Sequence, residues 1–296
     1  MNAPNHRNHD FGIARLTALK ELWFHTGTAC NLECPFCLEG SKPGDSRLER
    51  LTLADIAPLM DQALSLGVQR FCFTGGEPLI VKDIVKILAY ALQHRPCLVL
   101  TNGTAPLIKR AHQLKTLQQQ PHALSFQISI DAPDEAAHDS QRGWGNFMRA
   151  IEAIKLLNAV GFNVSIARHS TPTEDTQAVS AQYRTLFKKH SIADDIALVP
   201  LPNFERPGFK SDVVGVTAGE WSSFLSMNRP ATMCTYSRMA LKRGGQLRMH
   251  ACPFTDDDSA FETTSDLSAS TNETIRLSHH RCKFCVSQGT RYSDGA

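Results

Sequence analysis

The sequence predicts an α/β protein whose main part is a partial (β/α)6 TIM-like barrel, followed by a small C-terminal α+β domain. Two observations lead to this fold class. Apolar strand patterns alternate with helical patterns from about residue 20 to residue 205, and such alternation is typical of a parallel sheet. At roughly 30 residues per strand and helix, this span holds about six units rather than the eight of a full barrel.

Six short apolar runs are the expected strands, at residues 21–26, 70–73, 98–101, 124–130, 162–167 and 196–199. Helical patterns lie between them. The clearest begins at Thr52, a good N-cap residue, and ends at Gly67, which suits the position after a helix. Another begins after Asn146 and stops at Gly161. The alternation of strands and helices is therefore visible in the sequence itself.

The chain divides into three parts by composition. Residues 1–19 form a polar N-terminal tail, residues 20–205 form the barrel, and residues 206–296 form the small C-terminal domain, where the alternation stops and Gly, Ser, Thr and short charged runs take over. The length of 296 residues suits one large domain with a smaller appendage.

Composition also narrows the compartment and the partners. The chain has 9 Cys and no apolar segment of the signal-peptide type, which indicates a reducing, cytoplasmic setting where clustered cysteines are more often metal ligands than disulfides. A formal net charge of +2 with scattered basic residues argues against a nucleic-acid partner. No stretch approaches the ~20 apolar residues of a membrane span.

Three cysteines follow the first predicted strand at C-x3-C-x2-C spacing: Cys30, Cys34 and Cys37. Structural zinc sites usually close with four ligands, whereas an iron-sulfur cubane held by three thiolates keeps one iron free to coordinate a substrate or cofactor. The spacing therefore predicts a cluster with an open iron.

Further candidate residues follow the next strands, on the face of a barrel that carries active sites. They are Gly75, Gly76, Glu77 and Pro78 after the second strand, Asn102 after the third, Ser129 at the end of the fourth, and Arg142 beyond it. Paired glycines allow close approach to a ligand, and Ser129 with Arg142 could hold a carboxylate. Each also has a plainer interpretation. The 75–78 segment and Asn102 occur in ordinary turns, Ser129 could cap a helix, and Arg142 could pair with Asp131 or Asp139.

The segments GTACNLECPFC, FTGGEP, TNG, and SID followed by HDSQRGWGNF resemble the radical S-adenosylmethionine superfamily over about residues 20 to 205. The resemblance implies that the three cysteines hold a 4Fe-4S cluster whose free iron chelates S-adenosyl-L-methionine. It also implies that Phe36 flanks the adenine and that residues 75–78 receive the methionine amine. Asn102, Ser129 and Arg142 would be further cofactor contacts. The family mechanism is reductive cleavage to a 5′-deoxyadenosyl radical, which abstracts hydrogen from the substrate.

Four more cysteines lie in the C-terminal part: Cys234, Cys252, Cys282 and Cys285. Four thiolates can close a zinc site or fully ligate a second cubane, and their spacing alone favours zinc. Given a radical enzyme upstream, the pattern resembles the twitch domain, a short relative of the SPASM domain, in which a cysteine pair around a hairpin and a terminal C-x2-C bind an auxiliary 4Fe-4S cluster. The expected cofactors are thus two 4Fe-4S clusters and S-adenosyl-L-methionine.

A fully ligated second cluster is expected to conduct electrons, which makes oxidation of a small polar metabolite the leading reaction. A flavodoxin- or ferredoxin-type protein would supply the first electron. His25 and Arg168, at strand ends near the mouth, are candidate proton-transfer or substrate groups, although structural roles suit them equally well. A peptide-modifying maturase is the second enzyme class, and a metal-binding scaffold without turnover is the alternative from a different class.

Overall fold

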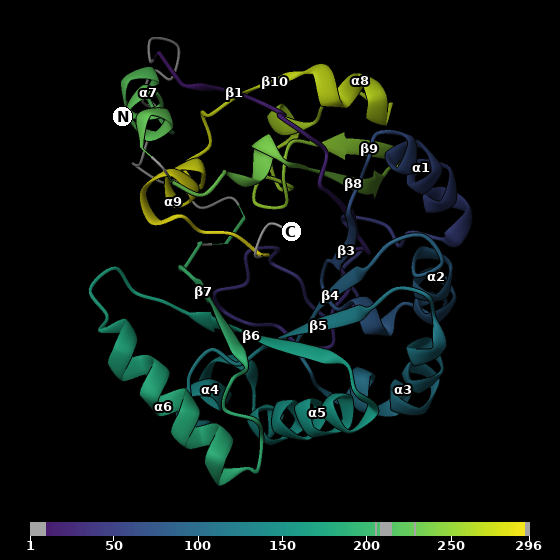
Figure 1. Cartoon of the computed structure of the whole chain (residues 1–296), viewed down its shortest axis with the longest axis vertical. Coiled ribbons are helices and arrows are strands. Elements are labelled where there is room, and N and C mark those ends of the chain that lie inside the picture. The colour runs from purple at the N-terminus through teal and green to yellow at the C-terminus, as the bar shows by residue number, and fades with distance from the viewer. Residues whose placement is uncertain (1–9, 205, 208–214, 228, 294–296) are drawn as a thin grey trace.

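Figure 1 shows the computed structural model, which describes residues 10–204, 206–207, 215–227 and 229–293. Its main sheet has eight strands in the order β7-β6-β5-β4-β3-β2-β8-β9. The parallel strands of the barrel are β2 (Glu21–His25), β3 (Arg70–Thr74), β4 (Cys97–Thr101), β5 (Leu124–Ser129), β6 (Asn163–His169) and β7 (Ala197–Leu201). All six predicted strands are confirmed, with ends shifted by a residue or two, and so is the partial barrel.

Helices cover the outer face of this sheet, where they form an arc around the strands in Figure 1. They are α1 (Leu53–Ser65), α2 (Ile84–Ala91), α3 (Ala105–Lys115), α4 (Glu135–Arg142), α5 (Asn146–Val160) and α6 (Thr176–Lys189). Thr52 caps α1 as predicted, because its hydroxyl accepts a hydrogen bond from Asp55 N. The Asp55 carboxylate in turn accepts a hydrogen bond from Thr52 N, which completes a capping box. Across the described residues, no helix is both long and apolar enough to cross a membrane.

The alternation of side chains along β5 shows how the sheet separates its core from its cavity. Phe126 and Ile128 are fully buried in the core between sheet and helices. Gln127 and Ser129 point the other way and line the cavity inside the barrel. Apolar residues therefore hold the helices, and polar ones face the inner space.

The C-terminal part joins the same sheet rather than packing beside it. Strand β8 (Ser237–Arg243) pairs in parallel with β2, and β9 (Gln246–His250) pairs antiparallel with β8. The predicted hairpin is present: its turn is Gly244-Gly245, with φ of 58° and 75°, values that favour glycine. Three helices complete this part: α7 (Ala218–Ser226), α8 (Leu267–Asn272) and α9 (Cys282–Gln288).

The segment predicted as a polar tail, residues 1–19, differs from that expectation. Residues 1–9 lie outside the described residues, but β1 (Ile13–Arg15) pairs antiparallel with β10 (Thr274–Arg276). Phe11 and Ala14 are buried. The pairing places Ala14 opposite Ile275 and covers these two side chains. Phe11 lies just before β1 and forms an isolated bridge with Thr217.

Candidate functional site

A cavity opens at the carboxyl ends of the barrel strands, where the sequence places the candidate residues. Its lining includes all three cysteines of the first loop and six of the eight other predicted positions: Cys30, Cys34, Cys37, Phe36, Gly75, Gly76, Asn102, Ser129 and Arg142. Glu77 and Pro78 are not part of the lining. The four predicted loops thus converge on one space.

The Gly75-Gly76 pair brings the second loop against the cysteine loop. Gly76 donates its N–H to Gly27 O at 2.9 Å, and Glu77 N donates to Ala29 O at 3.0 Å. A Cβ on Gly76 would lie 2.2 Å from Ala29 O, and Gly75 has a φ of 135°. Only glycine fits this contact, so here the glycine pair sets the position of the backbone before Cys30.

Glu77 stabilises the loops that follow β3 and β4 through hydrogen bonds to its carboxylate. Its buried carboxylate accepts bonds from Thr101 Oγ1 at 2.9 Å, Asn102 N at 2.8 Å and its near neighbour Leu79 N at 2.9 Å. Pro78 begins a short 3₁₀ helix. The carboxylate therefore ties the ends of β3 and β4 together and is engaged by the protein itself.

Arg142 forms an ion pair with Asp131, one of the two partners that the sequence suggests. Its Nη2 lies 3.0 Å from Asp131 Oδ1, and Nε also contacts this carboxylate. The Phe36 ring lies beside it, with Arg142 Cζ 5.3 Å from the ring centroid and the His169 ring 4.1 Å away. Arg142 still lines the cavity, so the pair shapes one wall.

Asn102 lies next to the first cysteine. Its Nδ2 donates to Asn31 Oδ1 at 3.0 Å and points at Cys30 Sγ at 3.8 Å, while its Oδ1 accepts from Thr104. Ser129 is partly exposed and lines the cavity. Asn102 therefore orients the cysteine loop, and Ser129 faces the space in front of it.

The thiols of the first set hold their protons in the absence of a bound metal. Burial raises the pKa of Cys30 to about 12, with Glu77 adding to the shift, and burial also raises the pKa of Cys34 and Cys37. A metal replaces these protons when thiolates ligate it. Three such thiols around an otherwise open cavity fit a soft metal centre with one free position.

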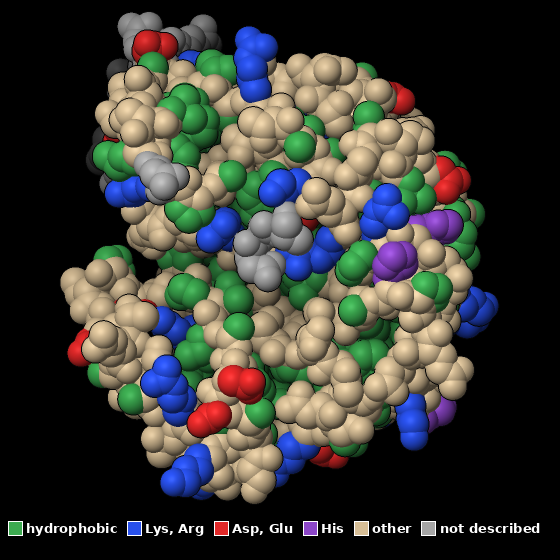
Figure 2. All heavy atoms as spheres, viewed as in Figure 1, with side chains coloured by type: hydrophobic (Ala, Val, Ile, Leu, Met, Phe, Trp, Pro, Cys, Tyr) green, Lys and Arg blue, Asp and Glu red, His purple; other side chains and the backbone are tan. Residues whose placement is uncertain are grey.

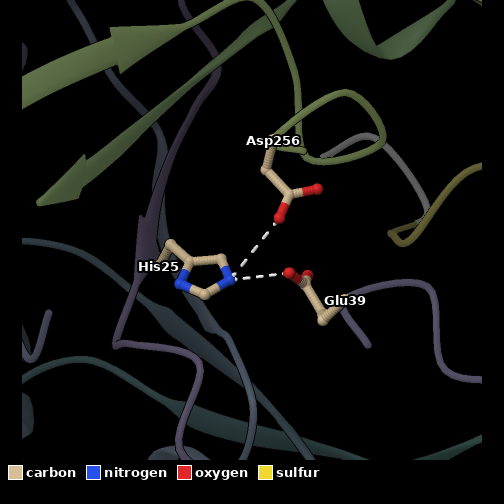
Figure 3. A group of neighbouring side chains, drawn as sticks. All are labelled: His25, Glu39 and Asp256. Atoms are coloured by element: carbon tan, nitrogen blue, oxygen red, sulfur yellow. Dashed lines mark hydrogen bonds and ion pairs between the residues drawn. The ribbon is translucent and has the colours of Figure 1, made fainter. Parts of the chain in front are cut away.

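Figure 3 shows three buried side chains, His25, Glu39 and Asp256, drawn from β2, the first cysteine loop and the loop after Cys252. His25 Nε2 lies 2.8 Å from Glu39 Oε2 and 3.7 Å from Asp256 Oδ2. Gly27 N donates to His25 Nδ1, so the ring proton sits on Nε2 and is donated to Glu39. A metal at Nε2 would require that proton on Nδ1. The group is thus a hydrogen-bonded link between two loops.

The four C-terminal cysteines surround a second, mostly apolar pocket. Its lining includes Cys234, Cys252, Cys282 and Cys285, together with Arg281. Burial raises the pKa of Cys252 to about 12 and the pKa of Cys282 and Cys285 well above the usual value. We call this pocket the auxiliary pocket. The structure brings all four predicted residues to one place.

An aromatic wall, formed by Phe204, Phe254 and Tyr292, separates the two pockets. Phe204 and Tyr292 line the barrel cavity, and Phe254 lines the auxiliary pocket. The Phe254 ring centroid is 4.8 Å from that of Phe204 and 4.6 Å from that of Tyr292. The two cysteine sites are therefore joined through packed rings, without an intervening solvent layer.

Sequence reasoning missed several residues at these sites. Glu39 and Arg281 each lie close to a cysteine in sequence, which is the one signal that could have found them. Arg238, buried near Cys234, follows no recognisable pattern. Of the residues suggested for chemistry, His25 is in the group of Figure 3, and Arg168 lines the barrel cavity, paired with Glu174 at 2.6 Å.

Comparison with known proteins gives the family. Residues 24–177 match the model of the Radical SAM superfamily. AdoMet-dependent heme synthase of Nitratidesulfovibrio vulgaris is 30% identical over 153 residues, which are 50% of this chain and 39% of that protein. The mycofactocin maturase MftC of Mycolicibacterium smegmatis is 28% identical over 162 residues, 52% of this chain and 40% of that protein. The chain thus matches less than half the length of these relatives.

Solved structures support the same fold over more of the chain. SuiB of Streptococcus suis, bound to precursor peptide SuiA, has a TM-score of 0.62 at 15% identity and covers 88% of this chain and 66% of that one. The anSMEcpe structure with bound AdoMet and the Cp18Cys peptide has a TM-score of 0.56 at 16% identity and covers 90% and 86%. At these identities the likeness concerns the fold alone. With the family match spanning most of the barrel, the chain belongs to the radical SAM superfamily.

Proposed function

We propose that this chain is a radical SAM oxidoreductase that oxidises a small polar metabolite, with a second iron-sulfur cluster as electron acceptor. The observation that carries the proposal is the pair of cysteine pockets on either side of one aromatic wall. One pocket has three thiols, and the other has four. Such a pair suits a centre that reacts next to a centre that accepts electrons.

In the barrel cavity, Cys30, Cys34 and Cys37 would hold a 4Fe-4S cluster, which together with S-adenosyl-L-methionine supplies a 5′-deoxyadenosyl radical. Gly76 keeps the loop backbone close, and Asn102 orients Cys30. Phe36, Ser129 and Arg142 would line the cofactor, whereas the Gly75–Pro78 segment would offer its backbone because the Glu77 carboxylate is already bonded.

In the auxiliary pocket, Cys234, Cys252, Cys282 and Cys285 would hold a second 4Fe-4S cluster, which would take one electron from the substrate radical. The substrate loses one hydrogen atom to the deoxyadenosyl radical, then one proton and one electron, so the net change is a two-electron oxidation. With all four positions taken by thiolates, the second cluster has no site for substrate.

Sulfur spacing supports a cluster over zinc in the auxiliary pocket. Tetrahedral zinc with Zn–S bonds of about 2.3 Å places its sulfurs about 3.8 Å apart. Among the described residues, only His25, Glu39 and Asp256 form a group of three with ligand atoms all within 4.8 Å. No three of the auxiliary sulfurs therefore lie within that distance of one another, which is wider than a zinc tetrahedron needs.

The electron donor we propose is a flavodoxin- or ferredoxin-type protein in the cytoplasm. Lys42, Arg47 and Arg206 line a surface hollow beside the cysteine loop, together with Glu33. On the face drawn in Figure 2, Lys and Arg side chains gather near the centre, and most acidic ones lie towards the edge. The nine free cysteines suit a reducing compartment.

Peptide maturation is a second candidate, because two similar proteins carry peptide substrates or maturation in their names: SuiB bound to SuiA, and MftC. A precursor peptide would need to reach the same cavity. Two incubations distinguish metabolite oxidation from peptide maturation. One uses metabolites made by the products of neighbouring genes, the other uses peptides encoded by neighbouring genes, and the mass of the product is measured in each. Deuterium transfer into 5′-deoxyadenosine then locates the abstracted hydrogen.

The central experiment is anaerobic reconstitution followed by incubation with dithionite and S-adenosyl-L-methionine. We expect 5′-deoxyadenosine, and about eight irons and eight sulfides per chain. If no 5′-deoxyadenosine forms, a metal-binding scaffold replaces the enzyme. If about four irons and one zinc are found, the electron-acceptor role is wrong.

A further inference from the structure

Two fully buried arginines lie beside the auxiliary cysteines. Arg238, on β8, and Arg281, just before α9, both have 0% exposure. Arg238 Nη1 donates to Cys234 O at 2.8 Å, and Arg281 forms part of the lining of the auxiliary pocket. Buried arginine is costly unless the charge is compensated, so each needs an explanation.

Among the described residues, the hydrogen-bond partners of Arg238 are all backbone carbonyls. Besides Cys234 O, they are Ser237 O at 2.9 Å, Ser270 O at 3.1 Å and Glu273 O at 3.5 Å. Throughout the described ranges, no carboxylate lies within ion-pair distance of this guanidinium. Carbonyls satisfy its N–H groups but leave its full charge in place.

Two cysteines of the auxiliary site, and after them the Glu273 carboxylate, favour the charge of Arg238. Burial lowers its pKa, and this shift is opposed first by Cys234, then by Cys252 and Glu273. As thiols, these cysteines are neutral. They carry charge when a metal replaces their protons, so the counter-ion of Arg238 exists when the site is loaded.

Arg281 connects the auxiliary site to the first cysteine loop. It pairs with Asp257 Oδ1 at 2.8 Å and donates to Phe254 O at 3.1 Å, and both residues follow Cys252. It also reaches Leu38 O, next to Cys37, at 3.4 Å. The guanidinium of Arg281 therefore contacts segments next to Cys252 and Cys37, and Arg281 itself directly precedes Cys282.

We propose that Arg238 is a counter-charge of the auxiliary cluster and raises its reduction potential, whereas the charge of Arg281 is already paired with Asp257. This inference rests on the proposed function. A cubane with four thiolates has a net charge of about −2, which becomes about −3 when one electron arrives. Fixed positive charge stabilises the reduced form more than the oxidised form, so Arg238 makes the site a better acceptor of the electron that leaves the substrate radical with one proton.

The test is a redox titration of the reconstituted protein, followed by electron paramagnetic resonance, in wild type, Arg238→Met and Arg238→Lys. The Cys282→Ala variant identifies which signal belongs to the auxiliary cluster. We expect Arg238→Met to lower the potential of that cluster and leave the first one unchanged, and Arg238→Lys to stay close to wild type. Arg95→Met is the control, because Arg95 also donates to carbonyls, Val68 O at 2.7 Å and His94 O at 2.7 Å, at the opposite end of the barrel.

Equal potentials in wild type and Arg238→Met, at equal iron content, would overturn the inference. Loss of about four irons in Arg238→Met but not in Arg238→Lys supports it, because charge is then what retains the cluster. If both variants lose these irons, the shape of the arginine side chain rather than its charge retains the cluster, and the inference is contradicted.

Iron content of the wild type reports separately on the proposed function. If the wild type holds about four irons and one zinc, the electron-acceptor role fails while the counter-charge remains testable. In that case Arg238→Met should lose zinc to a chelator faster than Arg238→Lys. Equal loss would remove the counter-charge role as well.

Discussion

The two cysteine sites are built on opposite principles. The barrel site depends on close backbone contacts, with Gly76 against Ala29, and its compensating charges, Arg142 and Asp131, already neutralise each other. The auxiliary pocket depends on side-chain burial and carries two arginines, one of which lacks a carboxylate partner within the described residues. We infer from this difference that the barrel site is arranged to admit a ligand and the auxiliary site to hold a fixed charge.

Removing one cysteine from each site should give the largest effects and separate their roles. Cys30→Ala should abolish formation of 5′-deoxyadenosine, and Cys282→Ala should retain cleavage that is uncoupled from product. Each variant should lose about four of about eight irons. Iron analysis and chromatography of 5′-deoxyadenosine measure both. Loss of cleavage in Cys282→Ala with its first cluster intact would break the comparison, because the auxiliary site would then take part in cofactor cleavage.

Glu77→Ala tests whether the Glu77 carboxylate stabilises the loops that follow β3 and β4. Three donors would lose their acceptor, which should cost about 3 kcal/mol and lower the thermal midpoint. Glu77→Gln keeps one acceptor oxygen and should cost less. Calorimetry measures both, and equal stability of wild type and Glu77→Ala would show that the carboxylate is not a support.

Gly76→Ala should act on the barrel site alone. Its Cβ would lie 2.2 Å from Ala29 O, so the cysteine loop must shift, at about 2 kcal/mol. Iron at the first cluster should fall while the auxiliary cluster remains. Gly219→Ala is the matched control, since a Cβ there meets nothing within 4 Å. A normal iron content in Gly76→Ala would mean that the loop tolerates the shift.

The smallest expected effect concerns the outer surface of the C-terminal part. Glu220 has a pKa lowered to about 2 by Lys283, by the backbone N–H of Thr217 and by the Thr217 hydroxyl. Because the folded value lies below the unfolded one, its contribution is present above about pH 4.5 and is lost as pH falls towards 2. Glu220→Gln should remove about 0.5 kcal/mol at pH 7 and nothing at pH 2. Urea unfolding at both pH values measures this, and a pH-independent loss would contradict it.

The barrel could be predicted from local sequence because its determinants are local. Strand alternation, the Thr52 cap and the glycines Gly67 and Gly161 after α1 and α5 act within a few residues, and the cysteine loop carries its own spacing. The contacts of Arg238 with Ser270 and Glu273 and the pairing of β1 with β10 could not, because the groups involved are separated by tens to hundreds of residues. Arg142 illustrates the middle case: the sequence offered Asp131 or Asp139, and geometry selected Asp131.

The pairing of β2 with β8 has a consequence for the order in which the molecule forms. Glu21 lies opposite Ser237, so one edge of β2 stays open until a strand made more than 200 residues later arrives. Contacts between such distant segments form late, because the entropy of closing a long loop is lost before the contacts contribute any favourable free energy. Cys234 precedes β8, and Cys252, Cys282 and Cys285 follow it, so this strand is made before most of the auxiliary cysteines. We infer that the docking of β8 on β2 is the late step that fixes the auxiliary cysteines relative to the barrel cavity.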